Sequence, residues 1–516
     1  MTETTHNADD FNTEGKYIPK AYQFERDMDY SAPERRFDSL QFDEDSNAHF
    51  VYHDMKELVD TPDGQAVLAK MIQTFNQAQR ERLDILDGYS KGKNHTILAG
   101  RRRLEQEKSD YRVAHNWGGY ISNYITGYLM SLPITIGTKA VDDDESELLE
   151  PIFNINDYND IDSLNFELGF DASRYGRAFE LHYRDADKQD SIVIVDPKEI
   201  FVIRSVDVSK EVIGAVHLPV YNGRVYMTIY TDKQIIKYHP HNEGSPNFQE
   251  QSRQNHLYKD VPVVEWWNNR YRQGDFETEI ALIDAYDAAQ SDTANYMSDL
   301  NDALLVINGD FESAGLSLAD VVTMKSANML MLESGVDHTG KQTSSTAGYI
   351  YKQYDVAGTE SYKTRLVNNI YTLSNVPNLD DDRFYSGQSG VALQYKMIGL
   401  EQMKSIKESF YTKALRRRYA IISNIHEELS ADVITANDLT FTFHTNIPQD
   451  IWAEVEKYIN ANGDISQTTL MELASFIDSA DNERKRLAED GINPSATDAE
   501  LEFVTRGRDV SGEEAN

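Results

Sequence analysis

The chain contains no cysteine in 516 residues. Disulfide bonds, thiolate metal ligands and cysteine nucleophiles are therefore excluded, because each of them requires a thiol. Long hydrophobic runs are also missing, since no uninterrupted apolar stretch approaches the ~18 residues that a transmembrane helix needs. The first residues, MTETTHNADDFNTEG, are polar and acidic and lack the basic and then apolar pattern of a signal peptide. We expect a cytoplasmic protein with no membrane partner.

Positive charge is scarce. The chain has 50 Lys and Arg residues against 86 Asp and Glu residues, which leaves a formal net charge of -36. Such a chain repels phosphate backbones at long range, and no concentrated basic face is evident in the sequence. A sequence-reading nucleic-acid binder is therefore disfavoured. A protein past which DNA must slide without sticking is still compatible with this charge.

The first half of the chain predicts helices followed by a run of strands. Thr61-Pro62 has the signature of a helix start, a capping hydroxyl followed by proline at the first helical position. A helix is expected around Asp162–Ser173. Turn residues then separate seven expected strands: Ala178–Tyr183, Ser191–Val195, Ile200–Ile203, Val212–Leu218, Val225–Tyr230, Gln234–Tyr238 and Val261–Trp266. Because these strands follow one another without alternating helices, the fold class is α+β.

The second half is mainly helical. A helix over 276–304, which Asp275 can cap, carries one broad polar side formed by Asp284, Asp287, Ser291, Asn295, Asp299 and Asp302. Residues 304–355 are strand-like, and a second helix is expected over about Thr359–Ser374. Apolar spacing predicts a long helix over Val391–Leu429, in which Gly399 indicates a kink or close packing. A strand at Leu439–His444 and two shorter helices, Ile451–Asn460 and Thr468–Leu487, complete the chain.

Two motifs could carry chemistry. Asp380-Asp381-Asp382 could hold a divalent metal, but adjacent carboxylates on one loop splay apart, and two-metal sites gather their ligands from separate elements. Gly335–Lys341 matches the glycine and lysine spacing of a phosphate loop, but Gln342 stands where a Mg²⁺-binding Ser or Thr is needed. We therefore expect no catalytic residues, no metal and no cofactor. A metal-dependent nuclease or nucleotidyl-transfer enzyme using Asp380–Asp382 is the alternative.

Other conspicuous residues have structural explanations. The histidines His95, His115 and His426 are expected to be surface or packing residues, and the Trp266-Trp267 pair to pack in a core or an interface. Arg416-Arg417-Arg418 lies on the long helix near three lysines, Lys404, Lys407 and Lys413. We interpret this basic helix as a partner for acidic neighbours in another subunit rather than as a DNA patch.

Four stretches in order resemble the portal proteins of tailed bacteriophages, of the type common in phages of Gram-positive bacteria. They are YRVAHNWGGYISNYITGYLMSLPI (111–134), RYGRAFELHYRD (174–185), NNRYRQGDFETEIALIDAYDAAQSDTANYMSDLNDALLVINGD (268–310) and SGVALQYKMIGLEQMKSIKESFYTKALRRRYAII (389–422). Each stretch is moderately specific by itself. Together they span most of residues 80–430 in the expected order, which makes the resemblance strong.

The resemblance implies a portal fold with a particular order of parts. These are an acidic arm (1–50), an α+β wing (51–275), a first stem helix (276–303), a small β-containing clip (304–355), a second stem helix (356–374), a tunnel loop (375–388), a long crossing helix with its return to the wing (389–447), a helical crown (448–490) and an acidic tail (491–516). It also implies a ring of about twelve subunits around a channel for double-stranded DNA.

The resemblance further implies where the protein acts and with what. The ring would occupy one capsid vertex of the virion after assembly in the host cytoplasm, and would contact the packaging terminase, the head–tail adaptor, and the major capsid and scaffolding proteins. The tunnel loop would project its side chains towards the axis: Asp380, Asp381, Asp382, Arg383, Phe384 and Tyr385. The stem would present an acidic face to the channel, formed by Asp284, Asp287, Asp299 and Asp302.

Overall fold

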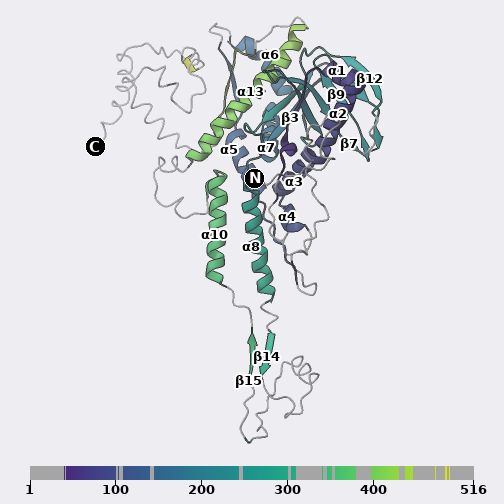
Figure 1. The fold of residues 1–516 in the computed structure, drawn as a ribbon. Coiled ribbons are helices and arrows are strands. Elements are labelled where there is room, and N and C mark those ends of the chain that lie inside the picture. The colour runs from purple at the N-terminus through teal and green to yellow at the C-terminus, as the bar shows by residue number, and fades with distance from the viewer. Residues whose placement is uncertain are drawn as a thin grey trace, which may run out of the picture.

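The computed structural model describes residues 42–99, 109–139, 145–242, 248–299, 304–308, 346–350, 355–378, 397–428 and 436–445, and the single residues 40, 103, 340, 471, 483, 484 and 487. These residues form an elongated molecule with a wide body at one end (Figure 1). Two helices extend from the body side by side, and a two-stranded ribbon lies beyond them. We call the two helices, α8 (Ile280–Asp299) and α10 (Val356–Leu373), the helical pair.

The body begins with a run of three helical segments. They are α1 (Met55–Asp60), α2 (Pro62–Thr74) and α3 (Arg80–Ser90), with a π-helical turn at Phe75–Gln79 between the last two. The predicted start of α2 is confirmed: Thr61 is the N-cap, and its hydroxyl accepts a hydrogen bond of 3.0 Å from the backbone N–H of Gly64. Proline follows at the first helical position, where its missing N–H costs nothing.

A six-stranded sheet packs against α1 and α2. Its strand order is β1-β5-β6-β9-β10-β12, with bounds Phe50–Tyr52, Ile200–Ser205, Val212–His217, Thr228–Thr231, Gln234–Tyr238 and Glu250–Asn255. All neighbours are antiparallel except β1, which runs parallel to β5. Leu58 and Phe75 of the helical run meet Phe201 and Ile229 of the sheet in one buried apolar cluster. This cluster holds the outer part of the body together.

A second sheet forms the inner part of the body. It has the order β13-β3-β4, with bounds Val263–Trp267, Arg177–Arg184 and Asp190–Val195. The helices α7 (Ile161–Tyr175) and α13 (Ile398–Glu428) share a core with it, in which Leu168, Trp266 and Tyr411 are almost completely buried. Gly176 ends α7 with a left-handed φ of 83°. A Cβ atom at Gly176 would lie 2.0 Å from the Arg272 carbonyl oxygen, so no other residue fits there.

Further elements complete the body. The helices are α4 (His95–Leu98), α5 (Trp117–Met130) and α6 (Glu145–Tyr158). The strand β2 (Thr135–Thr138) pairs with β16 (Leu439–Thr442), so the chain after α13 returns to the beginning of the body. A small sheet contains β7 (Val220–Tyr221), β8 (Arg224–Val225) and β11 (His241–Asn242).

The helical pair ends in a short antiparallel ribbon. Its strands are β14 (Leu304–Asn308) and β15 (Thr346–Ile350), and their register runs from Leu304 opposite Ile350 to Asn308 opposite Thr346. Asp355 caps α10 by accepting a hydrogen bond of 2.9 Å from the N–H of Gly358. The root of the pair is an apolar cluster that joins α8 and α10 to α3, α5 and the start of α13, including Leu86, Ile283 and Ile370.

The structure confirms most of the predicted elements and corrects several. The expected strand Val225–Tyr230 is divided between β8 and β9, and the sequence did not predict β1 or the polar strand β12. Asp275 does not cap α8, because the residues from Glu277 to Glu279 first form a 3₁₀ turn whose N-cap is Phe276. The helix Ile451–Asn460 lies outside the described residues, as does most of Thr468–Leu487. In the part of the chain that the structure describes, no helix is long and apolar enough to cross a membrane.

Candidate functional site: the junction of body and helical pair

The long helix α13 carries a fully buried arginine. The Arg418 guanidinium donates to the Glu180 carboxylate at 2.5 and 3.1 Å and to Asn165 Oδ1 at 2.8 Å. It also lies over the Trp266 ring, 5.1 Å from the ring centroid. Burial by itself raises the pKa of Glu180, but the charge of Arg418 outweighs it and lowers that pKa to about 2. Glu180 on β3 is therefore ionised at neutral pH and paired with Arg418 of α13.

A second buried cation lies three turns earlier on α13. The Lys407 ammonium donates to Asp275 Oδ2 at 2.8 Å and also contacts Asn268 Oδ1. The Asp275 carboxylate accepts further hydrogen bonds of 2.6 Å from the Ser173 hydroxyl and 2.8 Å from the Asn268 amide. Burial lowers the pKa of Lys407, and Asp275 opposes that shift. This network joins α13 to the end of α7 and to the loop that precedes α8.

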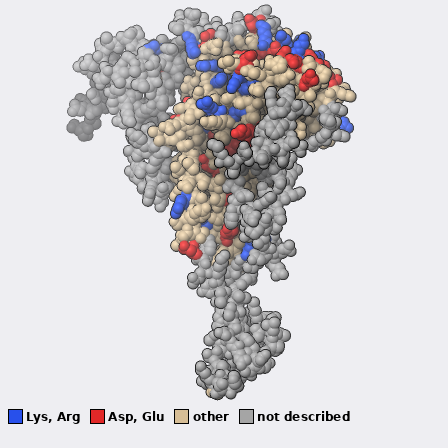
Figure 2. Space-filling model, in the orientation of Figure 1, with Lys and Arg blue, Asp and Glu red and all other residues tan. Residues whose placement is uncertain are grey.

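These contacts correct the interpretation of the basic helix. Lys407 and Arg418 pair inside their own subunit, and Arg417 Nη2 pairs with Asp260 Oδ1 of the same chain at 2.9 Å. The prediction of pairing between subunits is therefore wrong for these three cations. On the face shown in Figure 2, the other Lys and Arg side chains are scattered over the body among Asp and Glu rather than gathered in one patch.

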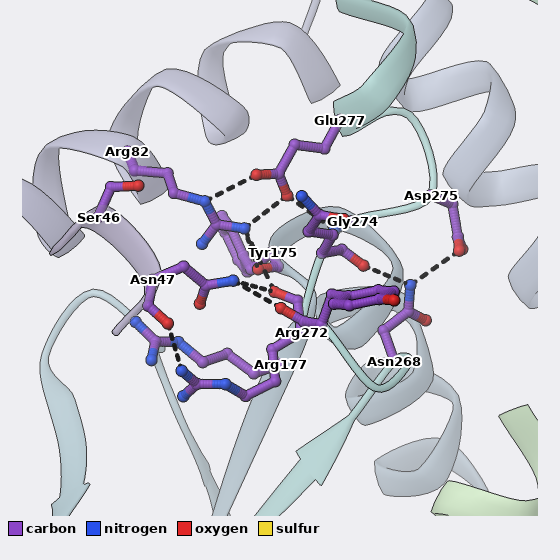
Figure 3. Close-up of polar contacts among 12 residues, drawn as sticks. Ser46, Asn47, Arg82, Tyr175, Arg177, Asn268, Arg272, Gly274, Asp275 and Glu277 are labelled. Carbon is purple, nitrogen blue, oxygen red and sulfur yellow. Dashed lines mark hydrogen bonds and ion pairs between the residues drawn. The ribbon is translucent and has the colours of Figure 1, made fainter. Parts of the chain in front are cut away.

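Buried ion pairs also hold the beginning of α8 (Figure 3). Arg82 on α3 donates to both carboxylate oxygens of Glu277, at 2.8 and 2.5 Å, and also reaches the backbone carbonyls of Tyr175 and Arg272. Asn47 donates through its side chain to the carbonyls of Tyr271 and Arg272, at 2.8 and 3.0 Å. Thus the loop from which α8 leaves the body is contacted by α3, by the end of α7 and by the residues before β1.

A buried carboxylate on β13 is paired with two further arginines at this junction. Glu265 is buried and is contacted by Arg204 and by Arg272, the latter at 3.3 Å. Burial raises the pKa of Glu265, but Arg204 and Arg272 outweigh this effect and lower it to about 2. Removing either arginine would leave Glu265 with one paired cation instead of two. These ion pairs join the loop that precedes α8 to β5 and β13.

The polar side of α8 holds an extended segment of the body. We call residues 109–116 the strap. The backbone N–H of Tyr111 donates to Asn295 Oδ1 at 2.7 Å, that of Val113 to Ser291 Oγ at 2.9 Å, and that of His115 to Asp287 Oδ1 at 3.1 Å. Two residues of extended chain advance roughly 6.6 Å and four residues of helix roughly 6 Å, so alternate strap residues match successive helical turns.

Two buried carboxylates of α8 lie at the end of this row of hydrogen bonds between the strap and the helix. His115 Nδ1 lies 2.8 Å from Asp287 Oδ1, and the Asn94 side chain donates to Asp287 Oδ2 at 2.5 Å. One turn earlier on α8, Asp284 Oδ1 accepts a hydrogen bond of 2.6 Å from the Tyr89 hydroxyl. The exposed fraction is 7% for Asp284 and 0% for Asp287.

The predicted channel-facing acidic stem therefore needs correction. Asp284 and Asp287 lie on one side of α8 as expected, but their own subunit encloses them, so they are not available to face a channel. Asp302 lies outside the described residues, and the Asp299 side chain is not described. The tunnel-loop residues Asp380 to Tyr385 also lie outside the described part, as does the phosphate-loop-like segment except Gly340.

Asp284 makes the stability of this junction depend on pH. Burial is the main cause that raises the pKa of Asp284, to about 6 from 3.8, and Asp287 adds to it. A raised pKa means that the folded protein favours the protonated form, so stability falls as pH rises from about 4 to about 6 and stays lower above that. Replacing Asp284 with asparagine keeps an acceptor for Tyr89 and is expected to stabilise the protein at pH 7 by up to about 3 kcal/mol.

Urea denaturation of the wild type and the variant at pH 4, 5, 6 and 7 measures this effect. The difference in the free energy of unfolding should shrink towards zero at pH 4. Asp157→Asn, at an exposed position of α6, is the control and should change stability by less than about 0.5 kcal/mol at every pH. An equal stabilisation by Asp284→Asn at pH 4 and pH 7 would show that its carboxyl is not the titrating group.

An open cleft of about 310 Å³ lies where the helical pair meets α13. Its walls are the loop from Asn268 to Glu279, the end of α10 at Leu373 and Asn375, and the first turns of α13. Gly399 lies in the first turn of α13, where a Cβ atom would be 2.7 Å from Asn375 Oδ1, so close packing rather than a kink explains this glycine. Lys407 and Asp275 line the cleft but are already paired with each other.

The histidines and tryptophans lie where packing residues are expected. His115 contacts Asp287, and His426 Nε2 lies 3.0 Å from Asp190 Oδ2. Trp266 is buried against Tyr411, and Trp267 stacks on Phe410. Among the residues that the structure describes, no three His, Asp or Glu side chains are grouped so that they could hold a metal ion.

Sequence reasoning missed the buried ion pairs, although one signal was present. Positions 400, 407, 411, 414, 418, 421 and 425 form a stripe spaced by three, four or seven residues, and all of them are buried. Lys407 and Arg418 lie on this stripe among apolar residues. A cation on an apolar stripe predicts a buried partner, because an unpaired buried charge is too costly.

The described residues form a scaffold: a helical pair projects from an α+β body, buried ion pairs fix its root, and a long helix crosses the body. The family model for phage portal proteins, SPP1 Gp6-like, matches residues 69–493. The chain therefore belongs to the phage portal protein family.

Individual relatives are distant. The portal protein of Bacillus phage SPP1 is 23% identical over 287 residues, which cover 51% of this chain and 56% of that protein. The portal protein of Clostridium phage phiCD119 is 22% identical over 262 residues, covering 46% of this chain and 57% of the relative. The chain thus spans little more than half the length of these curated relatives. A solved chain from the neck of an empty GTA particle, computed with C6 symmetry, has a TM-score of 0.40 and 11% identity over 72% of this chain and 90% of its own length.

Proposed function

We propose that this chain forms the ring-shaped channel at one capsid vertex through which double-stranded DNA is packaged and ejected. The observation that carries the proposal is the helical pair with its terminal ribbon, which projects from the body and is joined to it at its root by an apolar cluster and by the ion pairs of Glu277 and Asp275. Copies arranged around an axis would turn this projection into a tube and the bodies into a flange around it (Figure 1). Membership of the portal family supports this arrangement.

We assign the parts of the ring from the order of elements and the portal resemblance. The body is the wing, the helical pair is the stem, residues 304–355 are the clip, and residues 448–490 are the crown. We infer that the packaging terminase and later the head–tail adaptor dock at the clip, and that the wing and crown contact the major capsid and scaffolding proteins. The ring would assemble from about twelve copies in the host cytoplasm and remain in the virion.

The exposed side of α10 is the stem surface best suited to face DNA. One exposed stripe of α10, spaced by three or four residues, is uncharged and polar: Ser361, Thr364, Asn368 and Thr372. Glu360 and Arg365 are exposed beside this stripe. The uncharged groups of the stripe displace few counterions from the phosphate backbone, so they add little salt-dependent affinity. A wall of this kind would let the duplex slide, and the strongly negative chain around it would keep the duplex from adhering elsewhere.

Ring formation is the direct test of the proposed function. Mass photometry and electron microscopy of the purified protein, alone and co-expressed with capsid and scaffolding proteins, should show closed rings of about a dozen chains with a central hole. Rings are expected because one interface, repeated between identical subunits, closes on itself. A chain that stays monomeric under every assembly condition would contradict the proposal.

We further propose that Asp380, Asp381 and Asp382 face the channel axis and repel the DNA backbone, while Arg383, Phe384 and Tyr385 give weak contact and bulk. Replacing the three aspartates with asparagine should preserve rings, strengthen salt-sensitive DNA binding and slow or stall packaging, because repulsion of phosphates is lost. Packaging by assembled mutant particles measures this. Unchanged packaging would contradict the role of the loop.

No bond-making step is assigned to this chain, and no described feature favours the metal-dependent enzyme. Magnesium or calcium titration of the purified ring, with the three aspartates intact and replaced, separates the two functions. A tight ion site that disappears with the aspartates, together with metal-dependent cleavage of DNA, would support the enzyme instead. The sliding wall predicts neither result.

A further inference from the structure

The strap is attached to α8 by hydrogen bonds and by one ring contact, between His115 and Tyr286 at 4.8 Å. Three backbone N–H groups of the strap donate to α8 side chains, and Asn295 donates back to the Tyr111 carbonyl at 3.2 Å. The strap side chains contribute little apolar burial, since Tyr111 is 51% exposed and Arg112 is also exposed. Each hydrogen bond of this kind adds little net stability, because both partners can bond to water instead.

The face of α8 beneath the strap is equally hydrophilic. It consists of Asp287, Ser291 and Asn295, which are buried and bonded to the strap, whereas Asp284 one turn earlier is bonded to Tyr89 of α3. His115 of the strap is the potential cation that the structure places in contact with Asp287. Separation of the strap from α8 would hydrate the Asp287 carboxylate and weaken its repulsion by Asp284. The closed arrangement therefore contains groups that water would solvate well.

The helix α5, which follows the strap in the chain, is attached to α8 through apolar contacts instead. Directly after the strap, α5 inserts Ile121 and Ile125 into the apolar cluster that also holds Ile283 of α8. Opening of the strap leaves this cluster intact, because the strap contributes no residue to it. A local opening is thus possible without unfolding of the body.

We propose that the strap is a releasable cover whose opening exposes an acidic and polar face on α8. In the closed state the strap covers Asp287, Ser291 and Asn295 and holds α8 in register with the body. In the open state Asp287 reaches solvent, and α8 is held by its apolar root and by α10. This device goes beyond channel formation and does not depend on it, because it acts within one subunit.

Chemical labelling tests the proposal directly. Asp287 and Glu180 are both completely buried, but Asp287 lies under the strap and Glu180 lies in the inner core. A water-soluble carbodiimide with an amine, followed by peptide mass spectrometry, measures how fast each carboxylate becomes accessible. In the full-length native protein, Asp287 is expected to be labelled at least about tenfold faster than Glu180, because local opening is more frequent than disruption of the core.

A disulfide lock provides the matched control. The double variant Val113→Cys/Ser291→Cys joins strap and helix where the Ser291 hydroxyl already lies 2.9 Å from the Val113 nitrogen, and the chain has no other cysteine. Oxidation should lower labelling of Asp287 to the rate of Glu180, and reduction should restore it. Equal labelling of Asp287 and Glu180 in the reduced protein would overturn the proposal. So would fast labelling of Asp287 that the lock leaves unchanged.

Discussion

Replacing Arg418 with methionine is expected to lower the free energy of unfolding by about 3–5 kcal/mol, the range for breaking one side of a buried ion pair. Methionine occupies similar space, so the loss comes from Glu180, which would be left fully buried without its main cation. A domain is typically stable by about 5–15 kcal/mol, so this single change removes a large part of the total. Urea denaturation followed by tryptophan fluorescence measures it.

Two further variants separate charge from packing. Arg417→Met removes a partly exposed cation paired with Asp260 and should cost less than about 1 kcal/mol. The double variant Arg418→Met/Glu180→Leu removes both buried charges and should recover most of the stability lost in the single variant. A loss below about 1 kcal/mol for Arg418→Met would show that Glu180 is protonated or hydrated in the native protein.

Excising residues 309–345 is expected to leave rings intact but to abolish binding of the packaging motor. Asn308 and Thr346 form the last pair of the terminal ribbon, so a two-residue Asn-Gly turn can connect them without disturbing the strands. The excised residues connect the two strands of the ribbon, which lies at the far end of the helical pair from the body, so assembly should not need them (Figure 1). Mass photometry checks the rings, and co-sedimentation with the terminase checks docking.

A second variant distinguishes the docking surface from the length of the projection. It replaces residues 309–345 with a flexible Gly-Ser linker of equal length, which keeps the chain length but removes the surface. Both variants should fail to bind the motor if these residues form the docking site. Normal motor binding by either variant would show that the motor docks elsewhere on the ring.

Elements whose signal is local were predictable. A hydroxyl followed by proline predicted the start of α2 at Thr61-Pro62, because both the cap and the first turn depend on adjacent residues. Apolar spacing predicted α7, α10 and α13, and runs of strand-forming residues separated by turn signals predicted β3 and β13. The strand β12 was missed because its residues are polar and exposed, and only pairing with β10 makes them a strand.

The candidate site was not predictable in the same way. The polar side of α8 was recognised, but its occupant was not, because the strap lies 172–184 residues away in sequence. The two buried cations of α13 were assigned to another subunit for a similar reason: Lys407 finds Asp275 across 132 residues and Arg418 finds Glu180 across 238.

The sequence by itself determined the α+β class and the order of most helices and strands, because periodicity, caps and turn residues act over short distances. It also carried the resemblance to portal proteins, because that resemblance rests on four stretches of residues in order. Only the tertiary structure decided which charges are exposed and which are enclosed. A side chain shows its charge in the sequence, but its solvation depends on the segments that fold against it. For this chain, Asp284 and Asp287 were expected to line a channel, but the segments that fold against α8 bury them inside one subunit.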